Sequence, residues 1–163
     1  MLEIKRLLSS RWKECRDIRL DALMKNPIAF GSSFEEENKL SQTEWKKRTK
    51  NALFAFLNNK VVGIVILVFL KQQKLKHIAN IAGVYVKKEY RSQGIGKKLI
   101  EEALDEIKRN KQIIKINLNV NPDQKAAVNL YKKLGFKPIG VLKKDLFVKG
   151  KFYDELMMEK HIS

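Results

Sequence analysis

The sequence predicts an α/β (α+β) protein with a mixed, mostly antiparallel central sheet and flanking helices. Three observations support this fold class. Runs of β-branched and aromatic residues alternate with segments whose apolar residues recur every three or four positions. One apolar run, residues 78–86, passes through a glycine-bearing turn directly into a helical pattern. Two long strand-like runs flank Lys149-Gly150 near the end of the chain and predict a closing hairpin.

The same patterns give the order of elements as β-α-α-β-β-β-α-β-α-β-β. The expected strands cover residues 2–8, 52–57, 61–70, 78–86, 113–120, 136–148 and 151–160. The expected helices cover residues 11–24, 42–50, 94–110 and 123–134. The helix over 94–110 is expected to be a crossover, which makes the strands before and after it parallel. Residues 28–37 are expected to form a loop that runs into a helix at its acidic end.

The glycine-bearing turn before residue 95 has the chemistry of an anion site. A helix that starts there leaves backbone N–H groups without partners at the positive end of its dipole. Gly94 and Gly96 have no Cβ, so phosphate oxygens can approach the backbone closely. Arg91 and Lys97 add positive charge on either side of the turn.

Gly-x-Gly alone is weak support for a phosphate site, because a tight strand-to-helix turn needs no ligand. The three-glycine dinucleotide fingerprint is absent, since position 99 is Leu. The phosphate-loop motif also fails, because Gly96-Lys97 is followed by Lys98 instead of Ser or Thr.

What remains is Arg91-x-x-Gly94-x-Gly96, which follows a strand that ends in Val-Tyr-Val. This motif resembles the acyl-CoA-binding motif of the GCN5-related N-acetyltransferase (GNAT) superfamily, Arg/Gln-x-x-Gly-x-Gly/Ala. Two later blocks are similar to the second signature and the last strand of that family: Ala127-x-x-Leu130-Tyr131-Lys132-Lys133-Leu134-Gly135-Phe136 and Gly150-Lys151-Phe152-Tyr153-Asp154-Glu155-Leu156-x-Met158. The resemblance implies one acetyltransferase domain over residues 1–163. It also implies transfer of an acetyl group from acetyl-CoA to a primary amine of a small molecule or protein, by direct attack in a ternary complex.

The resemblance also assigns residues to the coenzyme. The implied coenzyme-binding residues are Val84, Tyr85, Val86, Arg91, Ser92, Gln93, Gly94, Ile95, Gly96, Lys97 and Gln124. Many relatives have an asparagine seven residues before the conserved tyrosine, where this chain has Gln124. Tyr131 matches that tyrosine and is the implied general acid, although it could instead be an aromatic core residue of an amphipathic helix.

The acceptor side is less defined by the sequence. Candidate acceptor-binding residues are Glu35, Glu36 and Asn80, the first two because Glu35-Glu36-Glu37 is a run of three acids in a chain of net charge +16. The alternative is that this run starts a helix, where acidic residues complement the helix macrodipole. Residues 78–86 contain no acid that could be the general base, so His77 or a water chain is left as a candidate.

Composition limits the remaining functions. The single cysteine, Cys15, cannot form an internal disulfide, and no apolar run is long enough to cross a membrane, so a cytoplasmic protein without a membrane partner is expected. Two histidines and one cysteine show no metal-ligand spacing, so no metal is expected. The lysines are spread along the chain without Arg-rich or aromatic-interleaved patches, which disfavours nucleic acid as a partner. A basic nucleic-acid- or ribosome-binding module that uses the same fold without catalysis is the alternative function, and a homodimer is left open.

Overall fold

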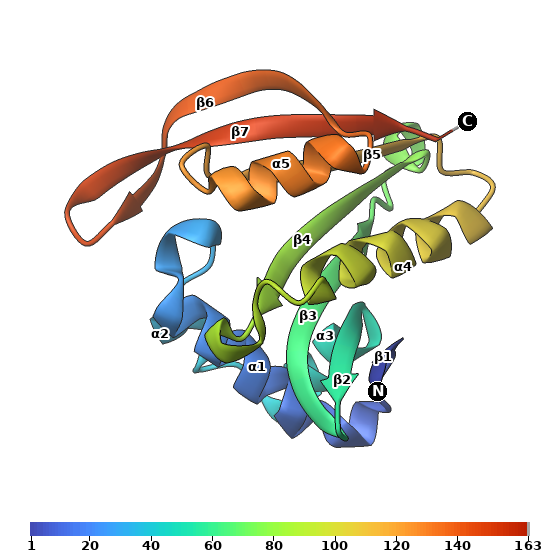
Figure 1. The fold of residues 1–163 in the computed structure, drawn as a ribbon, viewed down its shortest axis with the longest axis vertical. Helices are drawn as coiled ribbons and strands as arrows, with labels where there is room; N and C mark the ends of the chain where they lie inside the picture. Colours follow the sequence, from blue (N-terminus) through green and yellow to red (C-terminus); the bar gives the residue numbers. More distant parts are fainter. Residues whose placement is uncertain (163) are drawn as a thin grey trace.

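The structure is a computed structural model that describes residues 1–162 (Figure 1). Its strands are β1 (Leu2–Lys5), β2 (Ala52–Leu57), β3 (Lys60–Phe69), β4 (Ile78–Val86), β5 (Lys115–Val120), β6 (Lys137–Val148) and β7 (Lys151–His161). Its α-helices are α1 (Trp12–Lys25), α2 (Phe34–Glu37), α3 (Gln42–Lys50), α4 (Ile95–Arg109) and α5 (Lys125–Lys133). The seven strands form one sheet in the order β1-β2-β3-β4-β5-β7-β6.

The sheet confirms the predicted fold class. β4 and β5 pair in parallel, and every other neighbouring pair is antiparallel. One local difference from the sequence expectation lies in β1, while the helix expected at the acidic end of residues 28–37 is present as α2. The first strand ends at Lys5 instead of residue 8, because Leu7 turns inward and is buried while Leu8 remains exposed. The acidic segment forms a separate four-residue helix, α2, because Ser33 and Glu36 make a reciprocal capping box at its start.

Both faces of the sheet are covered, and the alternation of side chains along β2 shows this directly. Leu53 and Ala55 belong to the core cluster that includes α4 and α5, whereas Phe54 and Phe56 belong to the cluster that includes α1 and α3. Successive side chains on a strand point to opposite faces, so one strand can serve two cores. Figure 1 shows β4 running between α4 and α5, and this arrangement places the start of α4 close to the end of β4.

A buried ion cluster ties the three N-terminal helices together. Arg19 on α1 makes a bidentate pair with Glu37 on α2, with distances of 2.9 Å from Nε to Oε2 and 3.0 Å from Nη2 to Oε1. Arg48 on α3 donates to the same carboxylate at 2.9 Å. Burial acts to raise the pKa of Glu37, but the hydrogen bonds and charges of Arg19 and Arg48 outweigh burial and hold that pKa below its ordinary value of 4.5.

The cluster leads to a prediction about stability. Glu37→Gln removes the charge that compensates two arginines, so unfolding by urea at neutral pH should require about 3–5 kcal/mol less free energy than in the parent. The carboxylate contributes its stability above pH 4.5, and that contribution is lost as the pH falls through the lowered pKa. The difference in the free energy of unfolding between the parent and the Glu37→Gln variant should therefore become smaller at acidic pH.

Glu35→Gln is the matched control, because Glu35 is an exposed residue of the same short helix. We expect this control to unfold within about 0.5 kcal/mol of the parent. If Glu37→Gln is as stable as this control at neutral pH, the ion cluster does not hold the three helices together.

Candidate functional site

The centre of the site is the place where β4 and β5 separate. The two strands pair at three positions only, and the last pair is Asn80 with Asn117. β4 continues to Val86 and β5 to Val120 without further pairing between them. The backbone groups that face this gap therefore lack the ladder partner that a parallel sheet normally supplies.

A bulge in β4 accompanies the separation. The register of β4 against β3 shifts between the pairs Ala82–Ile66 and Tyr85–Ile64. Gly83 lies within the bulge with φ of +59°, a conformation that a residue with a Cβ rarely adopts. A Cβ at this position would also lie 2.6 Å from Cδ1 of Ile66. The positive φ therefore favours glycine here, and no local sequence pattern indicates it.

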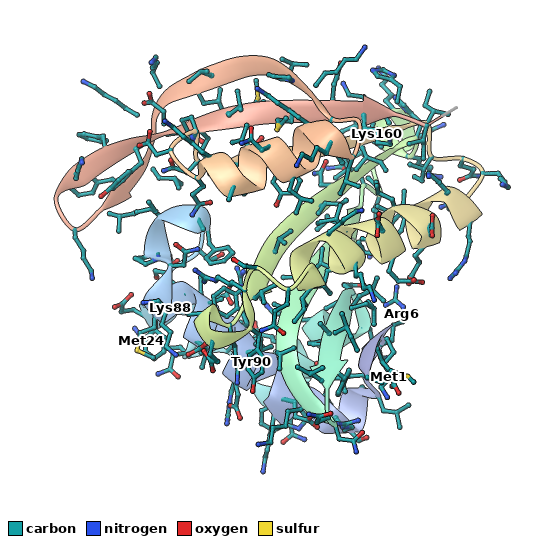
Figure 2. All side chains as sticks on the ribbon, viewed as in Figure 1. Met1, Arg6, Met24, Lys88, Tyr90 and Lys160 are labelled. Carbon is teal, nitrogen blue, oxygen red and sulfur yellow. The ribbon has the colours of Figure 1, made fainter. Side chains whose placement is uncertain are left out.

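A groove of about 620 Å³ occupies one side of the gap, between β4, the following turn and α5. Tyr90, labelled in Figure 2, lines this groove from the turn that connects β4 to α4. Arg91, Lys97 and Lys125 also line it, which gives the groove a positive rim. Such a groove suits an extended ligand with an anionic end.

The turn between β4 and α4 has the predicted anion-binding form. Gly94 is the N-cap residue of α4 with φ of +77°, and no side chain caps the helix. The N–H groups of Ile95, Gly96 and Lys97 occupy the first turn of the helix, where no intrahelical acceptor exists. Nε of Arg91 donates to the carbonyl oxygen of Val86 at 2.8 Å, which fixes the guanidinium beside the turn.

The opposite wall of the groove comes from α5. Tyr131 lines the groove, is buried, and packs edge-on against Phe136 with ring centroids 6.0 Å apart. Burial raises the pKa of Tyr131 to about 12, so its phenol is protonated at neutral pH. Gln124 lines the groove as well, and its Nε2 donates to Oδ1 of Asn26 at 3.4 Å.

A second cavity, of about 550 Å³, adjoins this groove. The residues that line both are Ala29, Phe30, Ile81, Ala82, Gly83, Leu118 and Asn119. Polar groups of the second cavity include Arg19, Asn80, Asn117 and Glu155. Nδ2 of Asn119 donates to Glu155 at 3.2 Å, and burial, followed by a hydrogen bond with Asp145, raises the pKa of Glu155. Two different ligands can therefore meet at the point where the strands part.

The structure brings most of the predicted coenzyme residues to the groove. The residues that line it are Val84, Tyr85, Val86, Arg91, Ser92, Gly94, Ile95, Gly96, Lys97 and Gln124. Gln93 is not part of the lining. The hydroxyl of Tyr85 lies on the other face of the sheet, where it donates to Asp21 at 2.7 Å. Tyr85 therefore meets the groove through its backbone.

The predicted acceptor residues are divided. Asn80 lines the second cavity. Glu35 and Glu36 line neither cavity: Glu35 is exposed on α2, and the carboxylate of Glu36 accepts from the backbone N–H of Ser33 at 3.2 Å. Their geometry matches the helix-start alternative, and a direct role in binding the acceptor stays a prediction.

Sequence reasoning missed Arg19, Asn117, Asn119 and Glu155. A signal existed for Arg19, because it occupies the same helical face as the buried residues Cys15, Ile18 and Ala22. A charged residue at such a position is rarely buried without a partner and a purpose. The other three become recognisable only when β5 and β7 lie side by side.

No helix within residues 1–162 has the length and apolar character needed to cross a membrane. No group of three or more His, Cys, Asp or Glu side chains in this range is arranged to hold a metal ion.

Comparison with known proteins gives the family. The family model "Acetyltransferase (GNAT) family" matches residues 12–136. An uncharacterised N-acetyltransferase of Methanocaldococcus jannaschii is 28% identical over 137 residues, which are 80% of this chain and 60% of that protein. The chain thus spans less than two thirds of this curated relative.

Solved structures extend the similarity over the whole fold. A GNAT-family acetyltransferase from Streptococcus pneumoniae superimposes with a TM-score of 0.87 and 27% identity, covering 99% of this chain and 100% of that one. The yncA protein of Salmonella typhimurium, solved with its cofactor acetyl-CoA, has a TM-score of 0.84 at 16% identity and covers 100% of this chain and 95% of its own. With the family model, the strand separation and the glycine-bearing turn in agreement, the chain belongs to the GNAT acetyltransferase family.

Proposed function

We propose that this chain is an acetyl-CoA-dependent N-acetyltransferase that transfers the acetyl group to a primary amine by direct attack in a ternary complex. The observation that carries the proposal is the gap between β4 and β5. It joins a groove that ends at an anion-binding turn to a second, polar cavity. A donor and an acceptor held in these two spaces meet without a covalent enzyme intermediate.

The groove fits the parts of the coenzyme in order. Its pyrophosphate belongs at the N-terminus of α4, where backbone N–H groups and the charges of Arg91 and Lys97 converge. Its pantetheine arm belongs along β4, where it can pair with backbone groups of Val84 and Val86 as an added strand would. The carbonyl of Val86 accepts from Arg91 but keeps a second lone pair for the ligand.

The acetyl transfer follows from this placement. The neutral amine attacks the thioester carbonyl carbon, the new C–N bond forms, the C–S bond breaks, and the amine loses one proton while the coenzyme thiolate leaves. Backbone N–H groups of β4 that point into the gap stabilise the oxyanion in the transition state. The proton lost by the amine balances the charge of the departing thiolate.

Tyr131 assists the leaving thiolate. With a pKa of about 12, its phenol is a much weaker acid than a thiol of pKa about 8.5, so complete proton transfer would be uphill by roughly 5 kcal/mol. Its main contribution is therefore a hydrogen bond to the developing thiolate. If Tyr131 donates its proton to the thiolate, the proton that the amine loses restores the phenol.

The direct test of the function has two measurements on the full chain. Calorimetry should detect acetyl-CoA binding, and a thiol reagent should detect coenzyme A release that depends on an added primary amine. Salt-sensitive retention on RNA without acetyl-CoA binding would instead support a binding module and overturn the proposal.

The turn gives a prediction about coenzyme affinity. Gly94→Val should weaken acetyl-CoA binding at least about tenfold, or roughly 1.4 kcal/mol, because it strains the αL cap and places a side chain where the pyrophosphate approaches. Gly150→Val is the matched control. Gly150 has φ of +79° against +77° at Gly94, and both have open space around the position of a Cβ. The control should lose stability to a similar degree but keep its affinity. Equal affinities in the two variants would remove the turn from the coenzyme site.

Tyr131 gives a prediction about turnover. Tyr131→Phe keeps the ring and deletes the donor, so acetyl-CoA should still bind while kcat falls about 10²-fold. Tyr153→Phe is the control, because Tyr153 lines neither cavity. Since the phenol stays protonated far above neutrality, kcat/KM of the parent should not decline up to about pH 10. A Tyr131→Phe variant with parental kcat would leave Tyr131 as a packing residue.

A further inference from the structure

Arg19 has one nitrogen that the fold leaves without a partner. Its side chain is 8% exposed, and Nε and Nη2 are both engaged by Glu37. Nη1 is buried and makes no hydrogen bond to any residue in the range 1–162. A buried guanidinium N–H without a hydrogen-bond acceptor costs free energy. We therefore expect Nη1 to bind an acceptor that is not part of the chain.

The charges around Arg19 point in the same direction. Arg19 and Arg48 share the single carboxylate of Glu37, so the cluster carries one positive charge in excess. Arg48 is 39% exposed and can be solvated by water, whereas Arg19 is buried. Water therefore solvates Arg19 less than Arg48, and an anion beside Arg19 would be stabilised by the excess charge.

The position of this nitrogen connects it to the reaction. Arg19 lines the second cavity, and Nη1 lies 3.1 Å from the point where a Cβ on Gly83 would stand. Gly83 lines both the groove and the second cavity. An anionic group bound by Nη1 therefore lies at the boundary between the two spaces, next to the reacting atoms.

The same cavity also offers acceptors for an amine. Oδ1 of Asn80 and Oδ1 of Asn117 are buried and have no hydrogen-bond partner among the described residues. The two residues pair across β4 and β5 and line the second cavity. The carboxylate of Glu155 lines it too. One cavity thus presents an unpaired cationic donor, two unpaired amide oxygens and a carboxylate that already accepts from Asn119. This set matches a molecule that carries both a carboxylate and an amine.

We infer that the acceptor is a free α-amino acid, with its carboxylate bound by Nη1 of Arg19. This inference rests on the proposed function and narrows its substrate. In an α-amino acid, two covalent bonds link the carboxylate carbon to the amine nitrogen. A carboxylate held at the boundary beside Gly83 therefore places the amine at the opening to the groove. A protein N-terminus has a neutral peptide carbonyl at the same position and cannot compensate the charge of Arg19.

The first experiment uses the parent protein. The free L-amino acids are screened as acceptors with acetyl-CoA and a thiol reagent, and the best one is compared with its α-carboxamide and with a dipeptide that begins with the same residue. We expect kcat/KM for the free acid to exceed that of the amide and of the dipeptide at least tenfold. The amino group of the α-carboxamide has a lower pKa than that of the free acid, so a larger fraction of it is neutral at pH 7. Amine protonation alone would therefore favour the amide as the acceptor.

The second experiment tests the residue. Arg19→Gln should raise KM for the free acid at least tenfold, leave KM for the amide and for acetyl-CoA unchanged, and bring the acid-to-amide ratio of kcat/KM close to one. Arg16→Gln is the matched control, because it removes a cation of the same helix that pairs with Asp17 instead of Glu37 and lines neither cavity. This control should keep the parental ratio. If Arg19→Gln does not fold, the acid-to-amide ratio of kcat/KM measured in the parent protein tests the inference.

The outcomes separate this inference from the proposed function. Equal transfer to acid, amide and dipeptide, or transfer only to amines without a carboxylate, overturns the role of Arg19 while the acetyltransferase stands. In that case Nη1 is satisfied by water. Unchanged acid selectivity in a folded Arg19→Gln variant overturns it as well. Absence of acetyl-CoA binding and of transfer to any amine overturns the function and this inference together.

Discussion

The site depends on one constraint of the sheet, which is that β4 and β5 stop pairing after Asn80 and Asn117. Unpaired backbone groups inside a protein are costly, and the fold accepts this cost along the remaining length of β4. The bulge at Gly83, where β4 shifts register against β3, lies in the part of β4 that no longer pairs with β5. Because α4 starts just beyond the end of β4, the same opening ends at a helix N-terminus. A ligand that adds a strand and ends in a phosphate satisfies both features together.

A second constraint, the ion cluster of Arg19, Glu37 and Arg48, links stability to recognition. Glu37 holds Arg19 in a fixed bidentate geometry, so the third nitrogen of the guanidinium cannot reorient to find another acceptor. The packing that joins α1, α2 and α3 therefore also presents a preorganised charge to the second cavity. Preorganisation of this kind lowers the entropic cost of binding a small acceptor.

Local patterns predicted most of the fold and the glycine-bearing turn that starts α4. Strand alternation, the Ser41 capping box and the turn at Gly94 are all encoded within a few neighbouring residues, and the structure contains each of them. The features that the sequence could not predict depend on distant partners. Arg19 and Glu37 are separated by 18 positions along the chain. The positive φ of Gly83 follows from its packing against β3, and Glu155 reaches the cavity only through the order of strands β5, β7 and β6. The acidic run at residues 35–37 was predicted to bind the acceptor from its charge alone. In the structure, Glu35 faces solvent, Glu36 caps a helix and Glu37 forms an ion pair with Arg19.

The two halves of the site therefore differ in how they encode recognition. In the proposed function, the donor half works mainly through backbone groups and a helix terminus, together with the charges of Arg91 and Lys97. The yncA protein of Salmonella typhimurium has the same fold at 16% identity and was solved with acetyl-CoA. The second cavity, where we propose that the acceptor binds, is lined by side chains of α1, β4, β5 and β7, which can change without disturbing the sheet. Under the proposed function, the donor is common to the family. The acceptor is then selected by the particular charges of this chain, among which the buried and incompletely paired guanidinium of Arg19 is the most constrained.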